Sequence, residues 1–109
     1  MTTPKPRAVA ELEELDAIFG ALAHRTRRAI LSVLYAHGGE LTSGAIAGRF
    51  DCSWPTTTRH LRQLQEAGLV TITMRGRERI YHLDTDRLHT IPTRWLQRFI
   101  PQQTEPPQT

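Results

Sequence analysis

The stretch SWPTTTRHLRQLQEAGLV, residues 53–70, decides the fold. It predicts a helix over residues 53–68 that begins at a capping serine, Ser53. A proline, Pro55, follows in the first turn, where its missing N–H costs no hydrogen bond. Small or apolar side chains then recur at steps of three and four residues, which is typical of one buried helix face: Thr57, Leu61, Leu64 and Gly68. The polar residues between them point elsewhere, so this helix has a second face that is free for a partner.

The residues before this helix predict three more helices. The first is amphipathic, and its apolar positions are Leu12, Leu15, Phe19 and Leu22. The second covers residues 25–37 and ends at the glycines at positions 38 and 39. A short third helix covers residues 44–50, and either Thr42 or Ser43 can cap its N-terminus.

The residues after it predict a β-hairpin and a last helix. In residues 69–83 apolar and polar side chains alternate on both sides of a basic turn at Gly76. Residues 84–89 are expected to form a polar connection. The last helix is expected to start at residues 90–92, with Pro92 in its first turn, and its apolar residues are Trp95, Leu96 and Phe99.

This order of elements predicts a mainly α fold with a β-hairpin wing: a winged helix-turn-helix, α-α-α-α-β-β-α. We expect one domain over residues 11–100, between a flexible arm at 1–10 and a disordered tail at 101–109. A chain of 109 residues buries only a modest core, so covering one more apolar face with a second copy would stabilise it.

Charge and composition limit the partners. There are 14 Lys and Arg against 11 Asp and Glu, and the isoelectric point is about 9.8. Residues 52–80 concentrate arginine, whose forked side chain suits phosphate and guanine: Arg59, Arg62, Arg75, Arg77 and Arg79. The single cysteine, Cys52, fits a reducing compartment. No secretory signal or membrane-length apolar run is found, so we expect a cytoplasmic protein.

Three stretches resemble the ArsR/SmtB family of bacterial winged-helix repressors. Residues 22–31, LAHRTRRAIL, are similar to the family's entry into its second helix. Residues 53–70 resemble its recognition helix and the lead into the wing. Residues 75–83, with Arg-Gly-Arg followed by Tyr-His-Leu, are similar to its wing. His24 and Arg25 replace the usual Asp-Pro, so the second helix must be capped differently.

The resemblance implies a double-stranded DNA operator and a homodimer as partners, with no membrane. The DNA contacts it implies come from the third helix, the recognition helix and the wing: Thr42, Ser43, Ser53, Trp54, Pro55, Thr56, Thr58, Arg59, Arg62, Arg75, Arg77 and Arg79. Arg59 is the best candidate for guanine, because its fork can bind O6 and N7 together. The dimer interface it implies lies on the first and last helices: Leu12, Leu15, Phe19, Leu22, Trp95, Leu96 and Phe99.

No cofactor and no metal are expected. Residues 41–50 lack the cysteines of the arsenic- and cadmium-sensing members, and residues 84–100 lack the zinc-sensing spacing. The run WLQRF, residues 95–99, is similar to the metal-independent branch. The sequence contains no phosphate loop, carboxylate pair or activated nucleophile, so an enzyme is not expected. Two alternatives stay open: a thiol-responsive regulator switched through Cys52, and a winged-helix interaction module that does not bind DNA.

Overall fold

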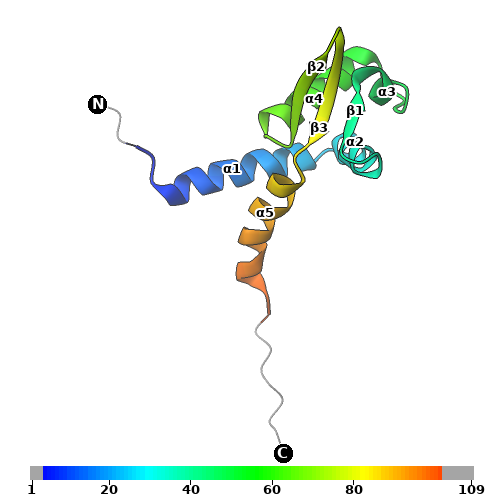
Figure 1. Ribbon diagram of the computed structural model, residues 1–109. Helices are drawn as coiled ribbons and strands as arrows, with labels where there is room; N and C mark the ends of the chain where they lie inside the picture. Colours follow the sequence, from blue (N-terminus) through cyan, green and yellow to red (C-terminus); the bar gives the residue numbers. More distant parts are fainter. Residues whose placement is uncertain (1–3, 102–109) are drawn as a thin grey trace, which may run out of the picture.

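The computed structural model describes residues 4–101 and has the predicted architecture, mainly helical with an antiparallel hairpin (Figure 1). The helices and strands follow one another as α1 (Arg7–Leu22), α2 (Arg25–Ala36), β1 (Glu40–Thr42), α3 (Ser43–Ala47), α4 (Trp54–Glu66), β2 (Val70–Arg75), β3 (Glu78–Leu83), α5 (Thr85–Leu96) and the 3-10 turn η1 (Gln97–Phe99). The predicted order of four helices, a hairpin and a helix is confirmed.

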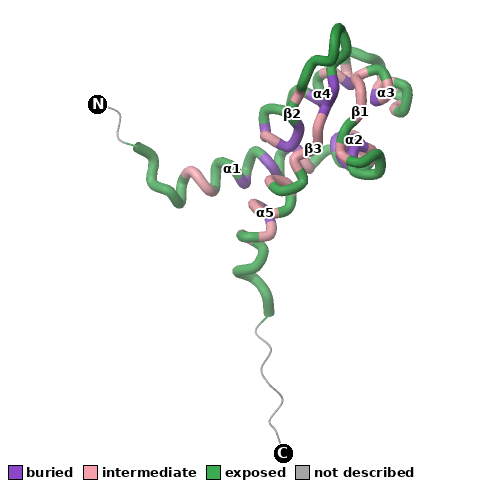
Figure 2. The backbone as a smooth tube through the Cα atoms, viewed as in Figure 1, coloured by how far each residue is buried: buried purple, intermediate pink, exposed green. Residues whose placement is uncertain are grey.

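A body of α2, α3, α4 and the sheet encloses one apolar core, to which the end of α1 also contributes (Figure 2). The predicted core positions of α2 and α4 are buried, and Ile46 of α3 is completely buried. The most deeply buried side chains come from five elements and from the loop between α4 and β2: Ile18, Ile30, Leu34, Ile46, Thr57, Leu61, Leu64, Leu69 and Val70.

The sheet has three antiparallel strands in the order β1-β3-β2. The sequence did not predict β1, because three residues are too few to show an alternating pattern. Its residue Leu41 pairs with Tyr81 of β3, which ties the loop before α3 to the wing. The hairpin turn has Gly76 at φ +64°, at the first central position of a two-residue turn, where glycine is favoured.

Side-chain caps start α2, α3 and α4, and those of α3 and α4 were predicted. Thr42 Oγ1 accepts from the N–H of Ala45 at 3.1 Å, so Thr42 rather than Ser43 caps α3. Ser53 caps α4 and accepts from the N–H of Thr56 at 3.3 Å. His24 replaces the family's aspartate at the start of α2, where its Nδ1 accepts from the N–H of Thr26 at 3.1 Å.

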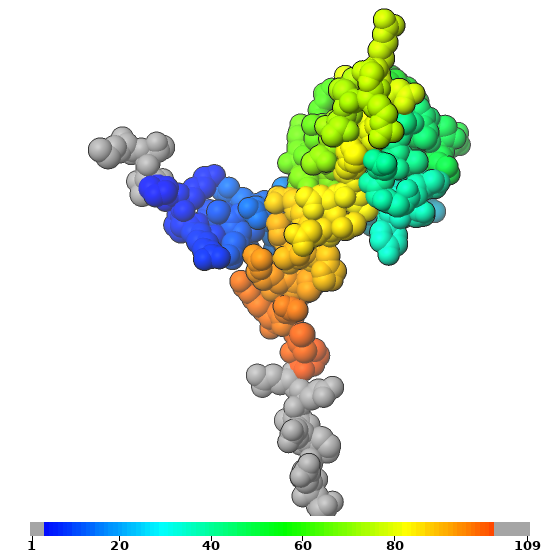
Figure 3. Space-filling view, in the orientation of Figure 1, coloured from blue at the N-terminus to red at the C-terminus, as the bar shows by residue number. Residues whose placement is uncertain are grey.

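Two helices, α1 and α5, extend away from the body (Figures 1 and 3). They contact each other, and the contact extends to Glu11 of α1, whose carboxylate lies 3.9 Å from the guanidinium of Arg98. Because α1 begins at Arg7, residues 7–10 are helical rather than part of an arm. The expectations for residues 1–3 and 102–109 lie outside the described part of the chain.

The expected start of the last helix is wrong. The helix begins at Thr85, where the Asp84 carboxylate accepts from the N–H of Arg87 at 2.9 Å, so residues 85–89 are helical and not a connection. Pro92 lies inside α5 and is buried. It cannot donate a hydrogen bond to the Leu88 carbonyl, but the helix continues through it because the surrounding turns pack against the body and α1. Over residues 4–101, no helix combines the length and apolarity needed to cross a membrane.

Candidate DNA-binding surface

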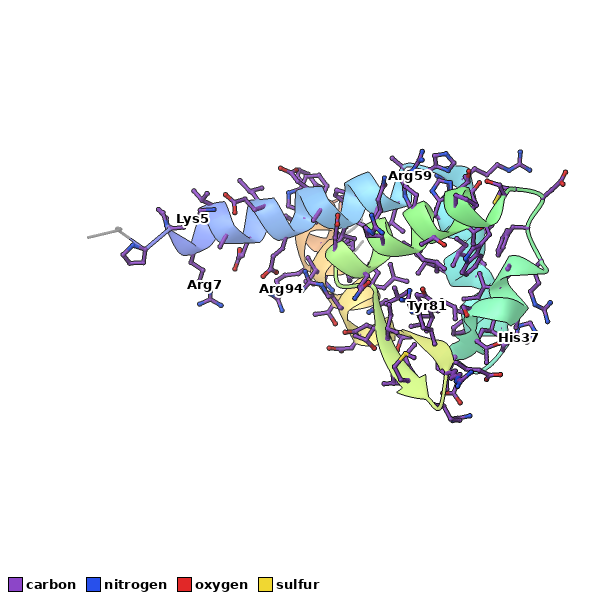
Figure 4. The ribbon with its side chains drawn as sticks, turned by 90° about the horizontal axis from the view of Figure 1, so that it is seen from above. Lys5, Arg7, His37, Arg59, Tyr81 and Arg94 are labelled. Atoms are coloured by element: carbon purple, nitrogen blue, oxygen red, sulfur yellow. The ribbon has the colours of Figure 1, made fainter. Side chains whose placement is uncertain are left out.

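The recognition helix α4 has one buried and one open face, as predicted. Its buried side chains are Thr57, His60, Leu61 and Leu64. Pro55, Arg59 and Arg62 lie on the opposite side and are exposed, as their three- and four-residue spacing requires. Figure 4 shows Arg59 on the side of α4 that faces away from the hairpin. Two guanidinium groups therefore stand on the open face of a helix that the core holds in place.

The N-terminal end of α4 offers fewer free hydroxyl groups than the sequence suggests. Ser53 Oγ donates to Thr56 Oγ1 at 2.9 Å, which leaves the Thr56 proton as a free donor. The hydroxyl oxygen of Thr58 is buried and has no hydrogen-bond partner, so it does not reach a partner in this conformation. Trp54 is 44% exposed and provides an apolar surface beside these groups. In the preceding helix, Thr42 uses its oxygen as a cap, and Ser43 is half-buried.

The wing presents three exposed arginines that do not share one face. Arg75 is paired with Glu78, whereas Arg79 is paired with Met74. Because neighbouring strand residues point to opposite faces, Arg75 and Arg79 lie on opposite sides of the hairpin. Arg77 is in the turn between them. The tip thus carries arginine on both of its faces, with Glu78 beside Arg75, and it projects from the body (Figure 3).

A buried arginine stands behind α4. Arg27 of α2 is only 8% exposed. Its Nε donates to the carbonyl of Ala21 at 2.7 Å and its Nη2 to that of Gly20 at 3.0 Å. Its Nη1 lies 3.2 Å from Nδ1 of His60, which must be the acceptor because arginine has no lone pair to offer.

The environment of His60 disfavours its protonation. Burial is the main cause, and the neighbouring His24, Arg27 and Arg59 add to it, so the pKa of His60 lies below its usual 6.5. The rings of His24 and His60 pack with their centroids 4.4 Å apart. His60 is therefore a neutral acceptor on the buried side of α4.

A second arginine holds the end of α4. Nε of Arg87, in the first turn of α5, donates to the Ala67 carbonyl at 3.0 Å. The next residue, Gly68, has φ +77°, and a Cβ there would overlap the Arg87 side chain. This contact was not predicted, because residues 84–89 were expected to form a connection rather than the first turn of a helix. The glycine in the helix-to-wing junction was the one available signal.

Cys52 contacts the first turn of α4. Its Sγ lies 3.0 Å from Oγ1 of Thr57, and that hydroxyl donates to the Ser53 carbonyl at 3.1 Å. The thiol is therefore the donor to Thr57, and it is half-buried. Along residues 4–101, no three His, Cys, Asp or Glu side chains come together as a metal site.

The residues expected at a dimer interface divide into two sets. Leu15 is buried and Leu22 packs against the core of its own protomer. Leu12 is 52% exposed, and Phe19, Leu96 and Phe99 are also exposed. We call Leu12, Phe19, Trp95 and Phe99 the α1–α5 apolar face. A cavity of about 130 Å³ lies between the two helices, and Leu12 and Trp95 line it together with charged residues of both: Glu11, Glu14, Arg94 and Arg98.

Comparisons with known proteins agree with this geometry. A family model described as a helix-turn-helix domain matches residues 22–73. The transcriptional repressor SdpR of Bacillus subtilis (strain 168) is 34% identical over 86 residues, which cover 79% of this chain and 92% of that protein. An ArsR-like transcriptional regulator from Rhodococcus sp. RHA1 has 32% identity and a TM-score of 0.71, with 82% of this chain and 81% of that chain covered.

A third relative is the homodimeric winged helix-turn-helix DNA-binding domain Mb0332 from Mycobacterium bovis, solved by NMR. It has 25% identity and a TM-score of 0.69, and the match covers 90% of each chain. The fold and the recognition helix thus define a winged helix-turn-helix regulator. The chain belongs to the ArsR/SmtB family of transcriptional regulators, as its motifs predicted.

Proposed function

We propose that the protein is a cytoplasmic repressor that binds a palindromic DNA operator as a homodimer and needs no metal. The observation that carries this proposal is the open face of α4, where Arg59 and Arg62 are exposed on a helix whose other face is locked into the core. A helix of this kind fits the major groove of B-DNA. The Bacillus relative is named a transcriptional repressor, which supports repression rather than activation.

Base and phosphate contacts fall to different elements in this proposal. Arg59 binds guanine through its fork, and Trp54 and Pro55 pack on a thymine methyl group or on sugar. Arg62 binds phosphate near the recognition helix, and the positive tip of the wing binds phosphates or a narrow minor groove. At the N-terminal end of α4, the free donor of Thr56 is better placed for phosphate than Ser53, whose proton is already used.

The dimer is proposed from the α1–α5 apolar face. This face joins two helices that extend from the body, and three of its four side chains are exposed: Leu12, Phe19 and Phe99. A two-fold axis through it would present two copies of α4 on one side of the DNA. Half-site centres would then be separated by about one or two helical turns, with one turn near 34 Å. The homodimeric Mycobacterium relative supports this arrangement.

Selection of bound fragments from a random DNA library, followed by sequencing, tests the function. We expect an imperfect palindrome and an affinity that falls steeply with salt, because phosphate binding releases counterions. No enriched sequence together with a shallow salt response would instead support the interaction module that does not bind DNA.

The hydrogen bond between Cys52 and Thr57 favours one second candidate, a thiol-responsive regulator. An adduct on Sγ would remove the donor from the first turn of α4 and introduce bulk beside it. Operator affinity should therefore be measured before and after thiol blocking, for the wild type and for Cys52→Ser, which keeps a hydroxyl donor. A loss of affinity in the wild type alone would support this candidate. No change on blocking would exclude it.

A further inference from the structure

We propose that Arg27 and Arg87 are positioning residues that fix the recognition helix α4 relative to α1 and α5, and thereby set the half-site spacing that the dimer accepts. This inference rests on the proposed function, since it assumes a dimer formed through the α1–α5 apolar face. Neither arginine lies on the open face of α4, so neither acts by touching DNA.

The contacts of Arg27 join three helices at one point. Its guanidinium spans the last-turn carbonyls of α1, at Gly20 and Ala21, and the imidazole of His60 in the middle of α4. Burying a charge is costly unless its donors are paired, so these partners must stay in place for Arg27 to remain inside. The three nitrogens of the planar guanidinium donate to these three acceptors from separate positions. A lysine ammonium has all its donors on one nitrogen, so it cannot reach the same three acceptors in the same directions.

His60 completes this link only in its neutral form. Nδ1 must carry a lone pair toward Arg27, and the buried, cationic surroundings keep it unprotonated. The ring of His24 packs against the imidazole of His60, while its own Nδ1 caps α2. The junction between α1 and α2 therefore holds His60 in one orientation, and with it the middle of α4.

Arg87 makes an independent link from the other projecting helix. The cap at Asp84 fixes the first turn of α5, and from that turn Arg87 reaches the Ala67 carbonyl at the end of α4. Gly68 leaves the space that this side chain occupies. The recognition helix is thus held in its middle by Arg27 of α2, which also binds α1, and at its end by Arg87 of α5. The helices α1 and α5 are the two that carry the dimer face.

Because α4 is held relative to the helices that carry the dimer face, the geometry of the dimer determines the distance between its two recognition helices. A tilt of α4 relative to α1 and α5 would move the N-terminal end of α4 away from its position relative to the two-fold axis. The partner's copy would move in the opposite sense, so the error would double across the operator. Loss of either link should therefore reduce the preference for one half-site spacing more than it reduces the affinity for a single half-site.

The test uses the full chain and a series of palindromes that differ only in the number of base pairs between the half-sites. Affinities are measured for the wild type, Arg27→Lys and Arg87→Lys, each shown to be folded by circular dichroism. Arg28→Lys is the matched control, because Arg28 lies on the same helix and donates to the Leu22 carbonyl of α1 at 2.8 Å, but makes no hydrogen bond to α4. Should Arg27→Lys fail to fold, His60→Asn, which keeps an acceptor near Nδ1, is compared with His60→Leu, which removes it. Should Arg87→Lys fail to fold, Arg87→Gln, which keeps a donor, is compared with Arg87→Leu, which has none.

We expect the wild type and Arg28→Lys to prefer one spacing at least tenfold, and Arg27→Lys and Arg87→Lys to lose at least threefold of that preference. His60→Asn should retain more of it than His60→Leu, and Arg87→Gln more than Arg87→Leu. An unchanged preference in the folded lysine variants, or an equal loss at every spacing, would overturn the positioning role. A wild type without any spacing preference, or without DNA binding, would instead overturn the proposed function itself.

Discussion

The ring of Trp95 meets the ring of Phe19 edge-on, with centroids 5.8 Å apart and planes inclined by 75°. This pair joins α5 to α1 within one protomer. Phe99 lies 4.8 Å from Trp95, centroid to centroid, yet remains 62% exposed. The aromatic cluster is therefore packed from one direction only, and its open side is the surface on which we expect a second copy to bind.

Replacing the exposed part of this surface should separate the dimer. The double substitution Leu12→Ser and Phe99→Ser removes apolar area that a partner would bury, at about 25 cal/mol per Å², while leaving the core of the protomer intact. Sedimentation at micromolar concentration should give about twice 12.4 kDa for the wild type and a shift toward the monomer for the variant. Met74→Ser is the control, since this wing residue is similarly exposed at 60%. A monomeric wild type would refute the interface.

Arg59 and Arg77 should differ in the kind of binding that they support. Arg59→Ala is expected to cost about 1–3 kcal/mol on the selected operator and to relax the preference at one base pair. Arg77→Ala should weaken all sequences more evenly and reduce the salt slope by about one unit. Competition binding at several salt concentrations separates the two effects. Identical behaviour of both variants would show that helix and wing are wrongly assigned.

Folding stability should decrease as the pH falls through the range in which free histidine is protonated. The pKa of His60 is lowered in the folded protein, so between that value and about 6.5 the unfolded chain binds more protons and gains stability relative to the folded chain. Urea denaturation at pH 7.5 and pH 5.5 should show a larger loss for the wild type than for His60→Asn, which cannot titrate. An equal loss in both proteins would place the pH dependence at other groups.

Zinc should leave operator affinity unchanged. No cluster of three ligating side chains forms within residues 4–101, and the sequence lacks the ligand spacings of the metal-sensing relatives. A titration of operator DNA with and without equimolar zinc measures this directly. A tenfold change, which corresponds to about 1.4 kcal/mol, would contradict the metal-independent assignment.

Gly68→Ala should destabilise the fold by about 1–3 kcal/mol, because a Cβ is strained at φ +77° and would displace Arg87. Gly48→Ala is the matched control, since Gly48 also ends a helix but has φ −73° and room for a Cβ. Thermal unfolding of both variants gives the comparison. A loss no larger than that of Gly48→Ala would show that Arg87 moves aside without cost.

Local sequence signals predicted the features that depend on local chemistry. The cap at Ser53, the stripe through Thr57, Leu61 and Leu64, and the turn at Gly76 are all present, because each depends on residues within a few positions of one another. The proline at position 92 misled the prediction, since a first-turn proline and a buried proline inside a helix look alike in sequence.

Contacts between distant residues were not predictable in the same way. Arg27 precedes Ile30, Leu31 and Leu34 by three, four and seven residues, so its spacing places it on the buried face of α2, but nothing in the sequence indicates its partner His60, which lies 33 residues away. Arg87 reaches across 20 residues to Ala67. The open face of the recognition helix could thus be predicted, whereas the side chains that hold this helix from behind became visible only in three dimensions.

Because α1 and α5 project from the body, the proposed dimer interface lies on different residues from the proposed base contacts of α4. With the proposed interface, substitutions at Leu12 or Phe99 would alter which chains can associate, and they would leave unchanged the α4 side chains proposed to meet the half-site. After gene duplication, two such regulators can therefore stop forming mixed pairs while each still recognises its ancestral half-site. New half-site sequences can likewise arise through changes on α4 without disturbing self-association.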